Sequence, residues 1–396
     1  MTFGGLGSAG LAGAIRAVIA AFAALGAALA HADEPRPLEF TADAFQHMEH
    51  WFPMATVANG DTPSTLPDGA RLTTAVGKSG PISLDAFNVE NGSTGMLVVH
   101  DGKVLYEGYW QGADRATRFT SWSMAKSVTS TLAGIALGEG AIRDLRDPVI
   151  RYVPQLSDSA YRDVTVEQAL QMSSGVWFDE TYDSETSDVA RFMTLGVRAG
   201  NANGFLTTLT AEAAAPGKKF NYNTAETQVV GWVVKNAVGK PLATYLSEKL
   251  WQPAGMEDDA TWFVDEPGGM EAAGMGLNAR LRDYARFGLL MLNDGVVDGR
   301  RILPEGWVAR ATRPSSPQVQ LGALYEGYPL GYQYQWWALP NGAFEAQGVF
   351  GQFLYVDPAH DLVIAKTSAW PTAWVDDREK AFSDVIDAIV RTVEVR

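Results

Sequence analysis

The pattern of hydrophobic and polar positions predicts strands toward both ends of the chain. Two runs rich in β-branched and aromatic residues surround Asp101-Gly102, a dipeptide that predicts a β-hairpin when it separates apolar stretches. Further strands are predicted at 332–337, 343–349, 353–357 and 362–366. A helix is predicted at about 377–393. We therefore expect one antiparallel sheet that is assembled from the two ends of the chain.

The middle of the chain shows helical spacing of apolar residues and no strand signal. Residues 141–215 carry short helical segments and polar loops, which we interpret as an all-helical insertion. Further helices are predicted at about 225–238, 241–252, 280–293 and 304–312. The predicted fold class is an α/β (α+β) sandwich, with an antiparallel sheet flanked by helices.

Four parts are predicted along the chain. Residues 1–30 are interpreted as a signal peptide, because Arg16 precedes an apolar run that is short for a membrane span and ends in small-x-small cleavage patterns. The alternative is an uncleaved N-terminal anchor. The other parts are an N-terminal extension at 31–91, an α/β catalytic domain at 92–140 and 216–396, and the helical insertion at 141–215. We expect a periplasmic or secreted protein with no stable membrane insertion after cleavage.

Composition narrows the chemistry. With 396 residues and 46% hydrophobic residues, the chain can bury a large core. The absence of cysteine excludes a disulfide framework, a thiol nucleophile and a thiolate metal site. A net charge of −15 argues against nucleic acid as a partner. His47 and His50 lack an obvious third ligand, so we expect no metal or other cofactor.

The candidate chemistry is centred on Ser123-x-x-Lys126. A spacing of three along a helix places both side chains on one face. A serine needs a neighbour that removes its proton, and a lysine can do this only where burial keeps part of it neutral. The apolar, small-residue run from Lys126 to Gly138 predicts such a buried helix. Because a pattern with two fixed positions also arises by chance, its context decides its meaning.

That context resembles the β-lactamase and penicillin-binding-protein superfamily of serine hydrolases, and class C most closely. Tyr222 follows Ser123-x-x-Lys126 by about a hundred residues, and a glycine-containing strand follows near Gly348. The resemblance spans about 92–390 and includes Asp147-Pro-Val-Ile-Arg-Tyr-Val-Pro, Met172-Ser-Ser-Gly-Val, Trp251-Gln-Pro-Ala-Gly-Met-Glu and Gly348-Val-Phe-Gly-Gln-Phe. It implies an acylated Ser123, with Lys126 and Tyr222 sharing the roles of base and acid, and no metal.

Two departures from β-lactamases are informative. Tyr222 is followed by Asn223 and Thr224, whereas class C enzymes usually carry Tyr-x-Asn. Ala346-Gln347-Gly348 stands where Lys-Thr-Gly is usual, which removes the cation that would hold a β-lactam carboxylate. Both departures resemble those of the 6-aminohexanoate-dimer (nylon oligomer) hydrolases and related esterases.

The resemblance to this branch implies further site residues. It implies an oxyanion hole from the backbone N–H groups of Ser123 and Val349, with Gly348 and Gln347 beside the substrate. It also implies that Tyr182 contacts the amide leaving group. The aromatic residues Trp336, Trp337, Phe350 and Tyr355 are expected to fill the sheet rather than line a cleft.

The predicted function is hydrolysis of amide or ester bonds in small linear substrates through an acyl-enzyme. Alternatives within the superfamily are a short-chain carboxylesterase, a β-lactamase and a D-aminopeptidase. An alternative of another class is a catalytically inactive cell-wall-binding or sensor protein. A Ser-His-Asp hydrolase is disfavoured, because no Gly-x-Ser-x-Gly occurs and His360 reads as a turn residue. Whether the protein forms a homodimer is left open by the sequence.

Overall fold

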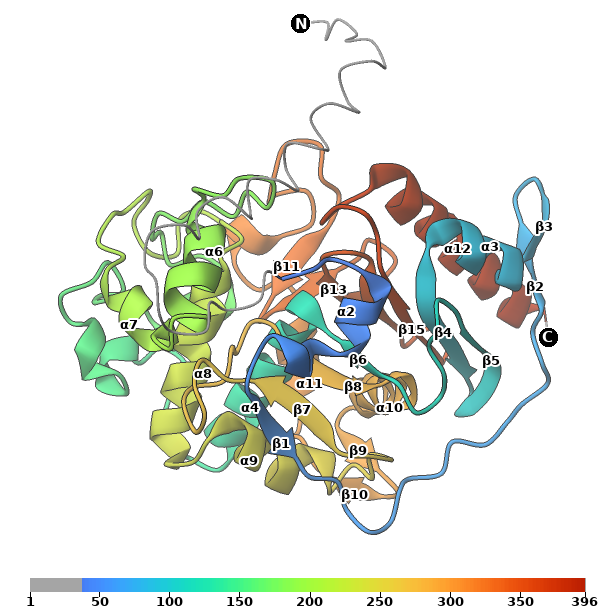
Figure 1. The fold of residues 1–396 in the computed structure, drawn as a ribbon, viewed down its shortest axis with the longest axis horizontal. Helices are drawn as coiled ribbons and strands as arrows, with labels where there is room; N and C mark the ends of the chain where they lie inside the picture. Colours follow the sequence, from blue (N-terminus) through green and yellow to red (C-terminus); the bar gives the residue numbers. More distant parts are fainter. Residues whose placement is uncertain (1–37, 396) are drawn as a thin grey trace, which may run out of the picture. The chain divides into compact units, whose positions relative to one another are not determined.

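A seven-stranded antiparallel sheet joins strands from the two ends of the chain, as the hydrophobic pattern predicted (Figure 1). The computed structural model describes residues 38–395, so the predicted signal peptide lies outside the described residues. The strands in sheet order are β11 (Gly331–Gln333), β12 (Trp336–Ala338), β13 (Phe344–Gly348), β14 (Gln352–Asp357), β15 (Leu362–Ser368), β4 (Ser93–His100) and β5 (Lys103–Tyr109). The pairing of β15 with β4 joins the two ends, with Ile364 opposite Val98.

Two tight turns in this sheet show where the sequence pattern was sufficient and where it was not. The predicted hairpin is confirmed, since β4 and β5 are joined at Asp101-Gly102 with φ angles of 52° and 69°. The prediction of a single strand at 332–337 is wrong. This segment is divided into β11 and β12 by Tyr334 and Gln335, which have φ angles of 34° and 67°. Positive φ at two successive non-glycine residues is uncommon, so the sequence gives no sign of this turn.

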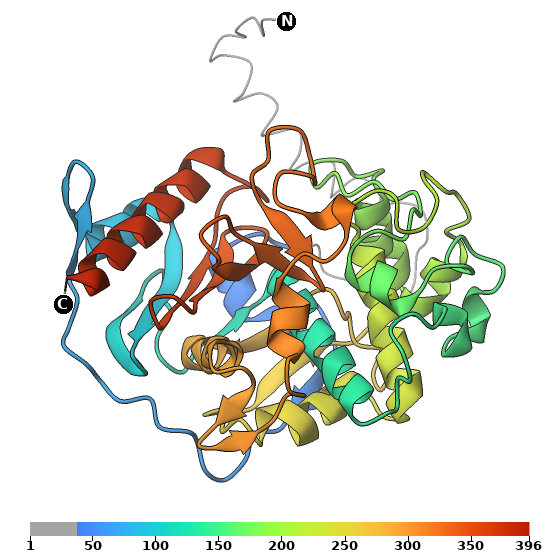
Figure 2. The same ribbon diagram turned by 180° about the vertical axis from the view of Figure 1, so that it is seen from behind.

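Helices cover the two faces of the seven-stranded sheet (Figures 1 and 2). α10 (Leu281–Leu292) packs on the face that carries Leu354 and Val363, which lie close to Gly288 of α10. α12 (Asp376–Glu394) covers the opposite face, where Phe382 lies 4.8 Å from Phe353 between ring centres. α3 (Leu84–Asn91) and the hairpin of β2 (Thr74–Gly77) and β3 (Gly80–Ser83) lie beside α12. The terminal helix is confirmed.

A second antiparallel sheet was not predicted. Its order is β1 (Met54–Val57), β7 (Ala260–Phe263), β8 (Leu277–Arg280) and β6 (Arg118–Thr120). Its strands have only three or four residues, which is too short for a detectable alternation of polar and apolar positions. β1 belongs to the predicted N-terminal extension, which therefore contributes a strand to the body of the protein.

Short helices make up the region that was predicted as the helical insertion. They are η3 (Val149–Arg151), η4 (Pro154–Leu156), α5 (Val166–Leu170), α6 (Asp188–Arg191), η5 (Phe192–Val197) and α7 (Ala202–Thr207). α8 (Thr224–Val238) packs against α5, α7 and the buried helix α4 (Ala125–Gly138). α8 therefore connects this region with the helix that follows the candidate nucleophile.

Most of the remaining helices match the predicted positions or belong to the N-terminal part, whereas the short helix at 317–319 was not predicted. The remaining helices are α2 (Ala42–Gln46), η1 (Met48–His50), η2 (Trp122–Met124), α9 (Leu242–Leu246), η6 (Ser247–Trp251), α11 (Trp307–Thr312) and η7 (Pro317–Val319). A short hairpin of β9 (Val296–Val297) and β10 (Arg300–Arg301) follows α10. Among residues 38–395, no helix is both long and apolar enough to cross a membrane.

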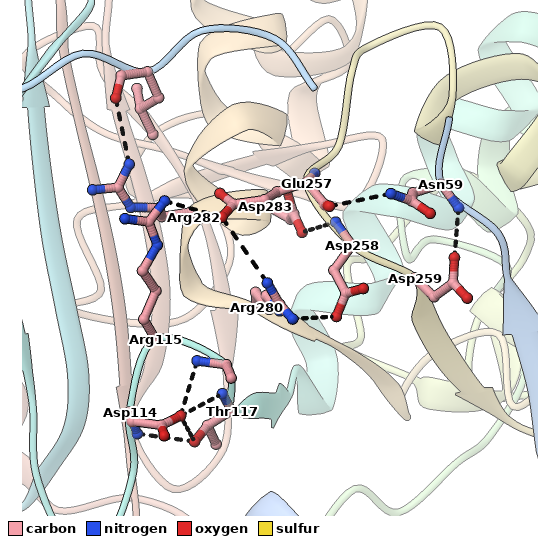
Figure 3. Close-up of polar contacts among 12 residues, drawn as sticks. Asn59, Asp114, Arg115, Thr117, Glu257, Asp258, Asp259, Arg280, Arg282 and Asp283 are labelled. Carbon is pink, nitrogen blue, oxygen red and sulfur yellow. Dashed lines mark hydrogen bonds and ion pairs between the residues drawn. The ribbon is translucent and has the colours of Figure 1, made fainter. Parts of the chain in front are cut away.

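Ionic contacts connect the turn at 257–259 with its neighbours (Figure 3). Asp283 of α10 is buried and accepts hydrogen bonds from the backbone N–H groups of Glu257, at 2.6 Å, and Asp258, at 3.3 Å. Arg280 pairs with Asp258 at 2.7 Å. The side-chain amide of Asn59 donates to the Glu257 carbonyl at 3.1 Å, which attaches the N-terminal segment to the same turn.

The two histidines of the N-terminal part lie together. His47 and His50 stack with 5.6 Å between ring centres, and His47 contacts Glu49 at 3.3 Å. In the described part of the chain, no group of three or more His, Cys, Asp or Glu side chains is placed to hold a metal ion.

Candidate active site

Ser123 lies where the two sheets meet, at the start of the buried helix α4. β6 ends at Thr120, η2 contains Ser123 and contacts β13 and β14, and α4 begins at Ala125. Trp122 has a φ of 43°, so the chain turns sharply just before the nucleophile. Ser123 is 9% exposed to solvent, whereas α4 is buried from Ala125 to Ala136. The predicted buried helix is therefore confirmed.

Lys126 lies directly against Ser123. Its Nζ is 2.9 Å from Ser123 Oγ, and it donates to Thr224 Oγ1 and to the Gly274 carbonyl oxygen, each at 3.0 Å. The residue is only 2% exposed. Burial lowers the pKa of Lys126 to about 8, while the negative charge of Glu180 acts in the opposite direction. A useful fraction of this amine is thus neutral near neutral pH, as removal of the Ser123 proton requires.

Tyr222 reaches the same serine from the segment that precedes α8. Burial raises the pKa of the Tyr222 hydroxyl well above its usual value, the charge of Glu180 raises it further, and a hydrogen bond with Ser123 lowers it. Lys126 Nζ lies 5.1 Å from the centre of the Tyr222 ring. Trp337 stacks on the ring from the sheet side, at 5.6 Å between centres. The structure therefore brings Ser123, Lys126 and Tyr222 together.

Tyr182 also lies at this site. Burial and the charge of Glu180 raise the pKa of its hydroxyl well above the usual value, and a hydrogen bond with Ser123 lowers it. The same hydroxyl donates to Glu180 Oε1 at 2.7 Å. Two tyrosines, Tyr182 and Tyr222, therefore lie close enough to Ser123 for its hydroxyl to affect the pKa of each.

Gly348 and Val349 border the candidate nucleophile Ser123 from the end of β13. A Cβ atom at Gly348 would come 2.5 Å from the carbonyl oxygen of Ser121 and 3.1 Å from the backbone nitrogen of Ser123, so the close approach requires glycine. Val349 follows directly and is buried. Among the residues that the structure describes, neither the Ser123 N–H nor the Val349 N–H has a hydrogen-bond acceptor. Two unused backbone donors therefore flank the serine.

Gln347 does not share the position of Gly348. Its side chain donates to Glu345, its neighbour on the same face of β13, and it pairs across the sheet with Phe353. Phe353 packs against α12, on the far side of the sheet from α10. The structure therefore does not bring the Gln347 side chain to Ser123.

Four aromatic residues were expected to fill the sheet, and the structure agrees with this for two of them. Trp336 and Tyr355 are fully buried within the sheet layers, as expected. Trp337 instead stacks on Tyr222, and Phe350 lies 5.4 Å from Trp122 beside the nucleophile turn. These two aromatic residues border the site.

The sequence did not indicate two residues of the site, Thr224 and Glu180. Thr224 accepts from Lys126, and both its N–H and its hydroxyl donate to Glu180. The departure from Tyr-x-Asn was a signal for Thr224, because it occupies the position of the asparagine. Asn223 instead caps α8, accepting from the Ala225 N–H at 2.8 Å. Glu180 lies in a polar loop without any motif.

Comparison with known sequences assigns this arrangement to a family. The profile described as Beta-lactamase matches residues 85–385, which include every site residue described above. The chain belongs to the beta-lactamase family. The predicted superfamily and fold class are confirmed, and this member of the beta-lactamase family is a serine hydrolase.

Known proteins resemble the chain to different degrees. It is 32% identical over 339 residues to the 6-aminohexanoate-dimer hydrolase of Paenarthrobacter ureafaciens, covering 83% of this chain and 85% of that protein. A Bacillus anthracis protein provisionally named 6-aminohexanoate-dimer hydrolase superimposes with a TM-score of 0.80 and 26% identity, over 92% of this chain and 99% of the other. A family VIII carboxylesterase shares the fold, with a TM-score of 0.61 and 19% identity over 78% of this chain and 95% of the other.

Proposed function

We propose that this enzyme cleaves amide or ester bonds of small linear substrates through an acyl-enzyme at Ser123, in the manner of a 6-aminohexanoate-dimer hydrolase. The observation that carries the proposal is the 2.9 Å contact between Ser123 Oγ and a buried Lys126 whose pKa is lowered to about 8. The name and the 32% identity of the Paenarthrobacter relative support the choice of substrate class.

Acylation follows from the positions of the groups. Lys126 Nζ takes the Ser123 proton as Oγ attacks the carbonyl carbon, and the proton passes through the Tyr222 hydroxyl to the leaving nitrogen or oxygen. The N–H groups of Ser123 and Val349 hold the charge that develops on the carbonyl oxygen, each contributing roughly 3 kcal/mol. Water then attacks the acyl-enzyme with Lys126 again as base, and a carboxylate is released.

Tyr182 and the strand residues are assigned supporting roles in this proposal. Tyr182 lies against the Ser123 hydroxyl, where the leaving group departs, so we assign it to contact with the leaving nitrogen. Gly348 provides the close approach of β13 to the substrate carbonyl. A role for Gln347 beside the substrate stays a prediction from the resemblance.

β-lactam hydrolysis is disfavoured as the main activity. Ala346 occupies the position of the lysine in the Lys-Thr-Gly motif and is buried in β13. A side chain without charge offers no partner for the carboxylate that β-lactams carry.

The decisive test compares hydrolysis of 6-aminohexanoate dimer, p-nitrophenyl acetate and nitrocefin by the wild-type enzyme and by Ser123→Ala. Ser130→Ala is the matched control, because Ser130 lies on the same helix and its buried hydroxyl has no hydrogen-bond partner in the described structure. We expect Ser123→Ala to abolish hydrolysis and covalent labelling by a fluorophosphonate, and Ser130→Ala to retain both. Activity retained in Ser123→Ala refutes the assignment, and a wild-type protein that neither labels nor hydrolyses favours a binding protein.

We also propose export to the periplasm or the medium. The support is the apolar run that follows Arg16, with cleavage patterns at Ala28-Leu29-Ala30 and Ala30-His31-Ala32. Mass spectrometry of the protein from fractionated native cells tests it. A mature chain that begins after Ala30 or Ala32 supports export, whereas an intact N-terminus in the cytosolic fraction contradicts it.

A further inference from the structure

A carboxylate that takes no part in the reaction proposed above lies behind Lys126. Glu180 accepts three hydrogen bonds: from the Thr224 hydroxyl, from the Thr224 N–H at 2.9 Å and from the Tyr182 hydroxyl at 2.7 Å. Thr224 in turn accepts from Lys126. A continuous chain of contacts therefore runs from Glu180 through Thr224 and Lys126 to Ser123.

The directions of these hydrogen bonds are fixed by the groups present. A carboxylate can only accept, so the single hydrogen of the Thr224 hydroxyl points to Glu180, and Thr224 Oγ1 can only accept from Lys126. The Gly274 carbonyl oxygen, 3.0 Å from Nζ, can also only accept. A neutral Lys126 amine has two hydrogens and one lone pair. With both hydrogens used, the lone pair is left facing the Ser123 hydroxyl.

Glu180 also acts on Lys126 through its charge. Burial lowers the pKa of Lys126, and the negative charge of Glu180 raises it toward its usual value. The other titratable groups near Lys126 are Tyr182, Tyr222 and Glu226 of α8, and burial raises the pKa of all three. The two tyrosines are uncharged near neutral pH, and burial disfavours the charged form of Glu226. Glu180 is therefore the nearby charge that raises the pKa of Lys126 against the larger, lowering effect of burial.

We propose that Glu180 and Thr224 are a positioning pair for Lys126. Thr224 orients the amine so that its lone pair meets Ser123, and Glu180 orients the Thr224 hydroxyl and adjusts the pH at which the amine loses its proton. Thr224 stands in place of the asparagine of Tyr-x-Asn, whose amide has a donor and an acceptor end and would not impose this orientation. The inference rests on the proposed function, because it requires Lys126 to act as the base.

The charge of Glu180 is tested by Glu180→Gln, which retains an oxygen that can accept from Thr224. The readouts are the pH dependence of kcat/KM for p-nitrophenyl acetate, which carries no charge, and the pH dependence of fluorophosphonate labelling. We expect the acidic limb of both profiles to move to lower pH by about one unit, since a nearby opposite charge shifts a pKa by that order.

The orientation by Thr224 is tested by Thr224→Val, which keeps the shape and removes the hydroxyl. We expect the plateau of kcat/KM to fall by about tenfold to a hundredfold, because misplacing a reacting group costs on that order. Thr224→Ser should restore most of the rate. Thr131→Val is the matched control and should retain wild-type activity, because the Thr131 hydroxyl donates only to the Ser127 carbonyl of its own helix.

Two results overturn the inference. One is an unshifted pH profile in Glu180→Gln together with wild-type activity in Thr224→Val. The other is a change in Glu180→Gln confined to KM for 6-aminohexanoate dimer, a zwitterion whose ammonium end could pair with a carboxylate, which would make Glu180 a substrate-binding residue. If circular dichroism shows that Thr224→Val does not fold, the pH profile of Glu180→Gln alone decides whether the inference holds. Failure of the proposed function is distinct, because the wild-type enzyme itself would then not be labelled.

Discussion

Gly348 touches the backbone that precedes the nucleophile so closely that a Cβ atom there would lie 2.5 Å from the carbonyl oxygen of Ser121. No real Cβ is accommodated at such a distance from a backbone atom, so β13 and the nucleophile turn can lie together only with glycine at this position. The same contact determines how far the N–H of Val349 lies from that of Ser123. The sheet and the helix therefore meet at the two N–H groups that we assign to the proposed oxyanion hole.

Gly348→Ala is expected to impair catalysis more than folding. The added methyl group separates β13 from the turn and moves one of the two N–H donors, and loss of one such donor costs about a hundredfold or more in kcat. Steady-state kinetics of kcat with p-nitrophenyl acetate, alongside the melting temperature, measure both effects. Gly60→Ala is the control, since a Cβ at Gly60 meets nothing closer than 3.5 Å. Wild-type kcat in Gly348→Ala contradicts the assigned role of Val349.

The pKa of Lys126 predicts how activity varies with pH. Burial lowers this pKa to about 8, so the lysine is mostly protonated at pH 6 and mostly neutral at pH 9. Because only the neutral amine can accept the Ser123 proton, kcat/KM for a neutral ester should rise by about tenfold or more over this range. A rate profile measured with correction for spontaneous ester hydrolysis tests this. A flat profile would exclude Lys126 as the base.

The sequence was informative where one local signal determines one local structure. Asp101-Gly102 combines two residues that accept positive φ, so the hairpin could be predicted from the pair alone. The turn at Tyr334 and Gln335 could not, because the surrounding packing holds two residues in a conformation that their own preferences disfavour. The second sheet escaped detection for a similar reason, since its short strands are defined by their partners rather than by their own pattern.

In the candidate site, too, some contacts could be predicted from local sequence signals and others could not. Ser123 and Lys126 lie one helical turn apart, so their contact follows from spacing and a predicted buried helix. Glu180 reaches the site through a loop, and its importance comes from Thr224, which is 44 residues away in sequence. No local pattern encodes such a contact, so only the folded chain could reveal it.

A pH-dependent contact holds the C-terminal helix. His360 contacts Asp357 at 2.8 Å and Glu394 of α12 at 3.2 Å, and the hydrogen bond to Asp357 raises the pKa of His360 in the folded protein. A raised folded pKa means that this contribution to stability is full below the unfolded pKa of His and is lost as the pH rises through the folded pKa. His360→Gln should therefore lower the melting temperature at pH 5.5 and have little effect at pH 9. Equal effects at both pH values would contradict this contribution.

Lys366 is a buried amine that lies among aromatic rings rather than against a carboxylate. It is 1% exposed, its Nζ contacts Ser368 and lies 5.3 Å from the ring centres of Trp370 and Phe382, and no ion pair joins it to any residue in the described structure. Burial lowers the pKa of Lys366 well below its usual value. The unfolded chain therefore binds the proton more tightly than the folded one, and this residue opposes folding at neutral pH.

Lys366→Met should consequently stabilise the protein. Methionine has a similar length and carries no charge to desolvate, so we expect the melting temperature at pH 7 to rise by about 2 °C or more. The gain should shrink toward pH 10, where the unfolded lysine also begins to lose its proton. Differential scanning calorimetry across this range measures it, with the exposed Lys219→Met as control. A destabilised Lys366→Met would show that the ring and Ser368 contacts of the ammonium outweigh its burial, and that Lys366 is a structural cation.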